Sequence, residues 1–239
     1  MLRSMLGEPP RTPDGALKAA FAAMGEFTEL CDRLSRRNPE IAGKLRTYAV
    51  WAEGLRRSLD ELEESLFAAE FFGNRVPRVS WEKLTDADRL NYGRHVYFDK
   101  NAYIRIFSLL DKMGTLMNDL LELKTEKVKP RFSYFTVLRR LRETGRHAEL
   151  AAMLTALKEE HRDAMSRLRR RRNTEIHYMN AELKDDLQTS ERMGSGNGEP
   201  WHLENLPGNM ADAREGWAMV LGTVERVFAF ACGRMRRLP

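Results

Sequence analysis

The stretch YIRIFSLLDKMGTLMNDLLEL, from Tyr103 to Leu123, is the most apolar part of the chain and decides the fold class. Its large apolar residues recur at helical spacing. These residues are Tyr103, Phe107, Met113, Leu116, Met117 and Leu120. We therefore expect this stretch to be the central helix of an all-α protein.

The start of this helix and the segments before it carry further helix signals. Thr85 and Asp88 have the spacing of a capping box, so the central helix is expected to begin there and to run to about Lys124. Asp14 is a candidate cap for a first helix. Asn38 followed by Pro39 predicts the start of a long helix that reaches about Phe72.

Helical spacing also continues after the central stretch. We expect a short helix from Ser133 to Thr144, a long helix from about His147 to Leu183, and a last helix from Ala211 to Arg237. Glycine and proline collect between Gln188 and Met210, which predicts a flexible loop.

Strand signals are nearly absent, so the expected architecture is an all-α bundle of long, roughly antiparallel helices. We expect two regions. Residues 1–84 form an N-terminal helical region that packs on the bundle, and residues 85–239 form the main helical domain, with the loop at about 188–210.

Composition excludes several classes of protein. The chain of 239 residues is 42% hydrophobic and 31% charged, which is typical of a globular protein. Its two cysteines are too few for a disulfide framework or a cysteine-rich zinc site, and they fit a reducing compartment. No apolar run is long enough for a membrane span and the N-terminus lacks a signal-peptide core, so we expect a cytoplasmic protein without membrane contact.

Motifs for metals and cofactors are also missing. The chain has no P-loop and no dinucleotide fingerprint, and it does not carry the two Glu-x-x-His motifs of a di-iron bundle. We therefore expect neither a metal site nor a cofactor. Asp111 and Lys112, which are adjacent in the central stretch, are expected to form a local ion pair.

The segment HRDAMSRLRRRRNTEIHYMN, residues 161–180, is strongly basic. Between His161 and His177 it holds six arginines and two acidic residues. Consecutive arginines repel one another, so such a run favours an anionic ligand, although a solvated charged face is the alternative. We expect RNA phosphates to be bound by Arg167, Arg169, Arg170 and Arg171.

Within this segment, Arg172, Asn173 and His177 have the pattern Arg-Asn-x-x-x-His. This pattern resembles the signature of the HEPN superfamily of small helical-bundle proteins. The stretch from Tyr103 to Asn118 is also similar to the central helix of one group of bacterial HEPN proteins. The resemblance covers residues 101–179.

The resemblance implies a metal-independent endoribonuclease of the toxin or phage-defence type. In such an enzyme the ribose 2′-hydroxyl attacks the neighbouring phosphorus. His177 would transfer protons, since histidine titrates near neutral pH. Arg172 would neutralise charge on the phosphate oxygens, and Asn173 would hold the His177 ring or a phosphate oxygen.

Helix geometry predicts a homodimer. Asn173 and His177 share a helix face, but Arg172 is five residues from His177, which is about 140° around the helix. Pairing the motif helices of two chains would bring two histidines and two arginines into one cleft. The resemblance implies the same composite arrangement and permits a separate antitoxin protein as a partner.

Two other functions remain open at this point. The chain could be a non-catalytic helical module that binds RNA or a partner protein through the arginine run. It could also be a regulatory subunit whose bundle only mediates assembly. Arg172, Asn173 and His177, all present, favour the enzyme.

Overall fold

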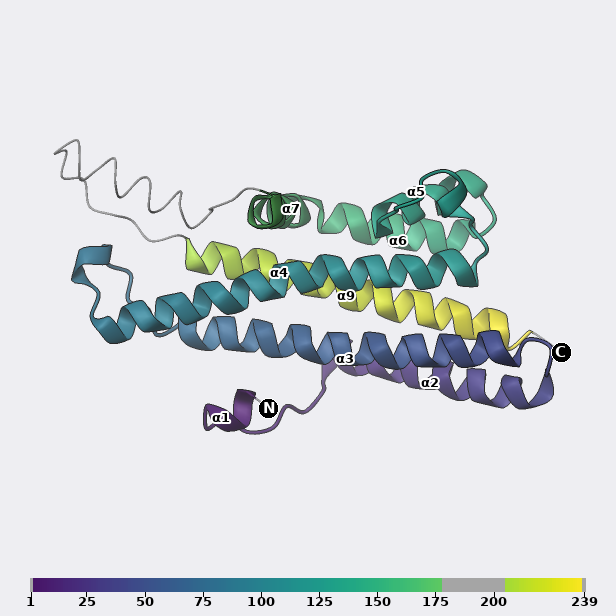
Figure 1. The fold of residues 1–239 in the computed structure, drawn as a ribbon, viewed down its shortest axis with the longest axis horizontal. Coiled ribbons are helices and arrows are strands. Elements are labelled where there is room, and N and C mark those ends of the chain that lie inside the picture. The colour runs from purple at the N-terminus through teal and green to yellow at the C-terminus, as the bar shows by residue number, and fades with distance from the viewer. Residues whose placement is uncertain (1, 178–204, 238–239) are drawn as a thin grey trace.

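The computed structural model describes residues 2–177 and 205–237. Within these residues all regular structure is helical, which confirms the predicted all-α class (Figure 1). The elements are α1 (Leu2–Met5), α2 (Gly15–Arg37), α3 (Ala42–Gly73), η1 (Trp81–Lys83), α4 (Asp86–Leu120), η2 (Thr125–Lys127), α5 (Tyr134–Thr144), α6 (Ala148–Glu160), α7 (Arg162–His177) and α9 (Leu206–Met235).

Four long helices, α2, α3, α4 and α9, form the bundle. Figure 1 shows that α3 runs antiparallel to α2 and α4, whereas α9 runs in the same direction as α4. The shorter helices α5, α6 and α7 lie between α4 and α9 in sequence. In space they form an extra layer on one side of the bundle, and in this view α7 points along the line of sight.

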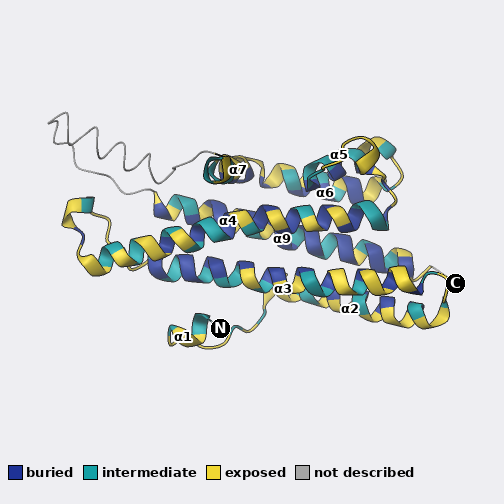
Figure 2. Ribbon diagram, in the orientation of Figure 1, coloured by how far each residue is buried: buried dark blue, intermediate teal, exposed yellow. Residues whose placement is uncertain are grey.

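One continuous hydrophobic core joins these helices. The buried faces of the long helices point toward one another, and exposed residues lie on the outer faces (Figure 2). The first and last long helices meet directly, since the rings of Phe27 and Phe228 pack edge to face with centroids 5.0 Å apart. The core includes residues on both sides of residue 84. The expected division of the chain into two regions, 1–84 and 85–239, stays a prediction.

The central helix begins as expected and ends early. Thr85 Oγ1 accepts a hydrogen bond from the Asp88 backbone N–H at 3.2 Å, and the Asp88 carboxylate accepts one from the Thr85 N–H at 3.0 Å. The capping box is therefore confirmed. The helix stops at Leu120 because Glu122 and Lys124 have positive φ angles of 52° and 54°.

The start of α3 was predicted wrongly. Asn38 caps the end of α2, where its side chain donates a hydrogen bond to the Leu34 carbonyl at 3.2 Å. Helix α3 begins only at Ala42, after a short turn. An asparagine satisfies a helix end as well as a helix start, so the sequence signal was ambiguous.

The expected helix from His147 to Leu183 is also different. It is broken at His161 into α6 and α7, and residues 178–183 lie outside the described residues. Of the expected loop over residues 188–210, residues 188–204 also lie outside the described residues. Its last part is helical, because Asn205 accepts a hydrogen bond from the Gly208 N–H at 3.1 Å and starts α9 at Leu206.

Within the described parts of the chain, every helix is too short or too polar to cross a membrane.

Candidate active site

Helix α7 carries the motif and lies across α4 and α9. Its buried side chains are Ala164, Met165 and Leu168. Gly216 of α9 makes this close approach possible, since a Cβ atom there would lie 2.8 Å from the Leu168 Cδ1 atom and 2.7 Å from the Ile106 Cδ1 atom. A glycine on the neighbouring helix thus sets the depth at which α7 sits.

Polar contacts fix α7 in place at four points, one of which is the ion pair between Glu175 and Lys100 of α4, at 3.1 Å. Arg167 binds Asp212 of α9 with two nitrogens, at 2.8 Å from Nε to Oδ2 and 2.6 Å from Nη2 to Oδ1. Arg171 forms an ion pair with Asp99 of α4. At the corner between α6 and α7, His161 Nδ1 lies 2.6 Å from a carboxylate oxygen of α9. The acceptor at this corner is Glu215.

Three of the four consecutive arginines lie over aromatic rings. Such contacts stabilise a cation without an anion. The distances from the guanidinium carbon to the ring centroid are 4.6 Å for Arg169 over Phe135, 4.7 Å for Arg171 over Tyr103 and 4.7 Å for Arg172 over Phe107.

The arginine run is therefore partly compensated inside the protein. The sequence favoured an anionic ligand for this run, but the Asp99 carboxylate and the aromatic rings supply part of the compensation. Arg169 and Arg170 are exposed, and neither forms an ion pair with a described residue. These two are the arginines best placed to meet a ligand in solution.

The structure brings two of the three motif residues, Arg172 and Asn173, into contact. Asn173 Oδ1 accepts hydrogen bonds from Arg172 at 3.2 Å from Nε and 2.7 Å from Nη2. His177 is exposed at the end of α7 and, among the described residues, makes no hydrogen bond to either. Because α7 is a continuous α-helix from Arg162, Arg172 and His177 stay about 140° apart around its axis.

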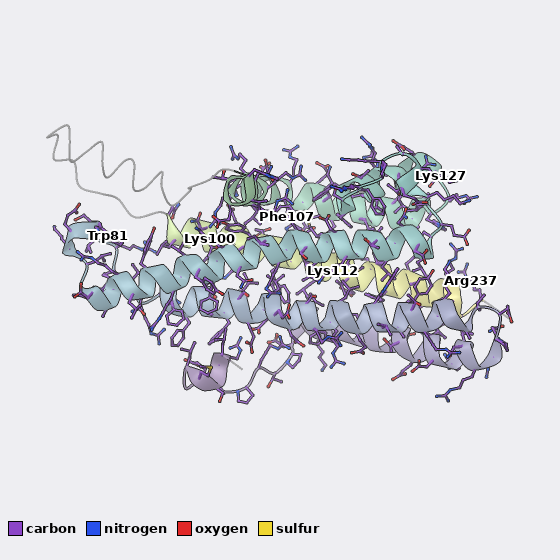
Figure 3. All side chains as sticks on the ribbon, viewed as in Figure 1. Trp81, Lys100, Phe107, Lys112, Lys127 and Arg237 are labelled. Atoms are coloured by element: carbon purple, nitrogen blue, oxygen red, sulfur yellow. The ribbon has the colours of Figure 1, made fainter. Side chains whose placement is uncertain are left out.

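A groove of about 430 Å³ opens beside Arg172 between α4 and α7. Figure 3 shows Phe107, which lines it, on the side of α4 next to α7. Sequence reasoning missed the groove because its walls come from separate parts of the chain. The lining residues are Ile104, Phe107, Ser108, Asp111, Lys112, Thr115, Phe132, Arg172 and Ile176.

Asp111 and Lys112 do not form the expected ion pair. Asp111 Oδ1 accepts a hydrogen bond from the Tyr134 N–H at 2.8 Å, and Lys112 Nζ donates one to Ser58 Oγ at 2.8 Å. Adjacent residues on a helix point in different directions, which explains the difference. Burial raises the pKa of Asp111, against the opposing effects of the Tyr134 N–H and of Arg172.

Two other observations bear on the site. Among the described residues, no group of three or more His, Cys, Asp or Glu side chains is arranged to hold a metal ion. A larger cavity of about 650 Å³ lies between the end of α3 and the start of α9. It is lined by His95 and Arg214 among others, but by none of the motif residues.

Residues 51–232 match the model of the Cthe2314-like HEPN family, and the chain therefore belongs to that family. No curated protein and no solved structure matches the chain significantly. The match begins within α3 and includes all of α7, so it extends well beyond residues 101–179. The HEPN prediction is confirmed, while the roles of Arg172, Asn173 and His177 stay predictions.

Proposed function

We propose that this HEPN protein is a metal-independent endoribonuclease that acts as a homodimer, with Arg172, Asn173 and His177 as its catalytic residues. One observation carries the proposal. A guanidinium oriented by an asparagine stands beside an open groove, and an exposed histidine lies on the same helix. This combination provides a phosphate ligand and a proton carrier.

The proposed reaction is a transesterification. A neutral His177 takes the proton from the ribose 2′-hydroxyl, and the 2′-oxygen forms a bond to the adjacent phosphorus. The bond from phosphorus to the 5′-oxygen breaks, and a protonated histidine gives its proton to that oxygen. The products are a 2′,3′-cyclic phosphate and a 5′-hydroxyl. Arg172 neutralises charge that builds on the phosphate oxygens.

The geometry of α7 supports a dimer. Arg172 and His177 of one chain face different directions, so one phosphate is reached by both groups only if a second copy contributes one of them. An exposed apolar stripe near the motif provides a contact for that copy. Its members are Leu90, Tyr97 and Ile104 at heptad spacing on α4 and Ile176 on α7, between 36% and 63% exposed.

The arginine run supplies affinity for RNA in this proposal. Arg169 and Arg170 bind phosphates directly, because they are exposed and have no acidic partner among the described residues. Arg167 and Arg171 add to the same positive surface, although each already pairs with an aspartate. DNA binds to this surface too, but it is not cut because it lacks the 2′-hydroxyl.

The biological setting that we propose is a cytoplasmic toxin or phage-defence nuclease. A separate antitoxin protein would silence it by covering α7 and the adjoining groove.

The proposal is tested by digestion of single-stranded RNA with wild type, His177→Ala and a matched histidine variant, His147→Ala, whose side chain lies next to Arg234 far from the motif. We expect His177→Ala to abolish cleavage while RNA binding persists, because binding rests on the arginines. Arg172→Ala should weaken both. Chelator should have no effect, and RNA with deoxyribose at the cleaved position should stay intact.

Three results would count against the proposal. If purified wild type cuts none of several RNAs at high concentration, the non-catalytic RNA- or protein-binding module replaces the enzyme. If His177→Ala cuts as fast as wild type, the mechanism is wrong. If light scattering shows only monomer at micromolar concentration while cleavage persists, the composite site is wrong.

A further inference from the structure

The groove beside Arg172 has a shape and lining that the proposed reaction does not itself require. Its volume of about 430 Å³ falls within the range of small-molecule sites. Ile104, Phe107, Phe132 and Ile176 form apolar walls, and the polar lining residues other than Arg172 come from one face of α4. Apolar walls with a few polar groups are typical of a small-molecule site.

Arg172 provides a stacking surface at this groove. Its guanidinium carbon lies 4.7 Å from the centroid of the Phe107 ring, and Asn173 Oδ1 accepts hydrogen bonds from its Nε and Nη2 atoms. A guanidinium next to an aromatic side chain gives an unpaired base a surface on which to stack. Unpaired RNA bases are commonly bound by stacking on arginine and aromatic side chains.

Asp111 and Lys112 give the groove a polar edge with both an acceptor and a donor. Asp111 uses Oδ1 for the Tyr134 N–H, and Oδ2 makes no hydrogen bond to a described residue. Lys112 uses one of its three N–H groups on Ser58. The lining thus includes the carboxylate oxygen Oδ2 of Asp111 and, on the adjacent residue, an ammonium group whose side chain reaches toward α3.

We infer that this groove binds the base of one unpaired guanine next to the scissile phosphate. Guanine presents neighbouring N1–H and N2–H donors, which suit a carboxylate, beside an O6 acceptor, which suits Lys112. Uracil presents a single N–H between two carbonyl groups, and adenine and cytosine present an amino group beside an acceptor nitrogen. The inference rests on the proposed endoribonuclease and names the nucleotide that it prefers.

The test is the binding of GMP, AMP, CMP and UMP to the full chain by calorimetry, which needs no cleavage. Wild type should bind GMP at least about fivefold more tightly than UMP, the lower end of discrimination by a two-point contact to a base edge. Asp111→Asn keeps an oxygen for the Tyr134 N–H but replaces the second acceptor by a donor. It should reduce the preference for GMP to about twofold or less.

Two further variants make the test decisive. Asp163→Asn removes the same charge from an exposed position on α7 and should leave the preference unchanged. Ser108→Trp fills the groove from an exposed position and should weaken the binding of all four nucleotides by about tenfold or more. This variant tests the groove even if circular dichroism shows that Asp111→Asn does not fold.

The inference is overturned if wild type binds the four nucleotides equally, or if folded Asp111→Asn or Ser108→Trp binds them as wild type does. Selective GMP binding without RNA cleavage would retain the guanine site and refute the nuclease. RNA cleavage without selective GMP binding would retain the nuclease and refute the guanine site.

Discussion

Arg171 on α7 and Asp99 on α4 form an ion pair between the two helices, in which the Asp99 side chain is only 4% exposed. Arg171 also lies over the ring of Tyr103, and the next residue, Arg172, lies over Phe107, one turn further along α4. The ion pair therefore fixes the register of α7 against α4 and with it the position of Arg172.

Asp99→Ala should lower the free energy of unfolding by about 3 kcal/mol, because it leaves the Arg171 charge without its buried partner. Urea unfolding followed by circular dichroism measures this. The matched control is Glu26→Ala, which breaks an exposed ion pair with Arg236 and should cost less than about 1 kcal/mol. Equal losses in the two variants would show that the Asp99 pair does not anchor α7.

Gly114→Ala should destabilise the protein by about 1 to 3 kcal/mol, because α5 begins directly against this glycine. A Cβ atom at position 114 would lie 2.9 Å from the Tyr134 Cα atom and 3.2 Å from its N atom, so backbone has to move. Gly25→Ala is the control, since a Cβ atom there meets no other group. It should stabilise α2 by about 0.5 to 1 kcal/mol. Thermal unfolding distinguishes the two, and a neutral Gly114→Ala would contradict the close contact.

Alkaline pH should destabilise the protein through its two cysteines. Burial raises the pKa of the Cys31 thiol to about 12 and that of Cys232 to about 11, from a usual value near 9. Above pH 9 the unfolded chain gives up these protons while the folded protein keeps them. The stability that the protonated thiols contribute is thus complete below pH 9 and is lost as the pH rises toward 11 to 12.

Urea midpoints measured between pH 8 and pH 11 check this prediction. Cys31→Ala should lower stability at all pH values but show a shallower decline above pH 9. Part of the decline should remain, because burial also raises the pKa of Tyr134 to about 12. A decline as steep in Cys31→Ala as in wild type would exclude the thiol as its source.

RNA affinity should depend steeply on salt, and the exposed arginines of α7 should account for part of that dependence. Replacing Arg169 and Arg170 together by alanine should flatten the slope of log affinity against log salt by about one to two units. Replacing Arg36 and Arg37, which are exposed at the far end of α2, removes the same charge and should change the slope less. Fluorescence anisotropy at several salt concentrations measures both, and equal changes would indicate a diffuse effect of net charge.

Local signals predicted those features of the fold that depend on neighbouring residues. The spacing of apolar residues found α4, and the pair Thr85 and Asp88 gave its first residue. The break at His161 was missed because no glycine or proline marks it. At the break, His161 contacts Glu215 of α9, which lies far away in the sequence.

In the candidate site too, the sequence predicted what neighbouring residues determine and not what distant residues determine. The sequence placed Arg172, Asn173 and His177 on one late helix, and helix geometry already separated Arg172 from His177. The sequence did not show which arginines are paired, because Asp99 and Asp212 belong to other helices. It also did not show the groove, whose lining joins α4, the turn before α5, and α7.

The contact between Phe27 and Phe228 has a consequence for the newly made protein. Helix α2 is complete at Arg37, but α9 starts only at Leu206, and translation at roughly 5 to 20 residues per second takes roughly 10 to 30 s to cover that distance. Helix α7 also emerges before α9, which carries its anchor Asp212. The ion pair between Arg167 and Asp212 therefore forms later than the contacts of α7 with α4, because Asp99, Tyr103 and Phe107 are made before α7 and Asp212 is made after it.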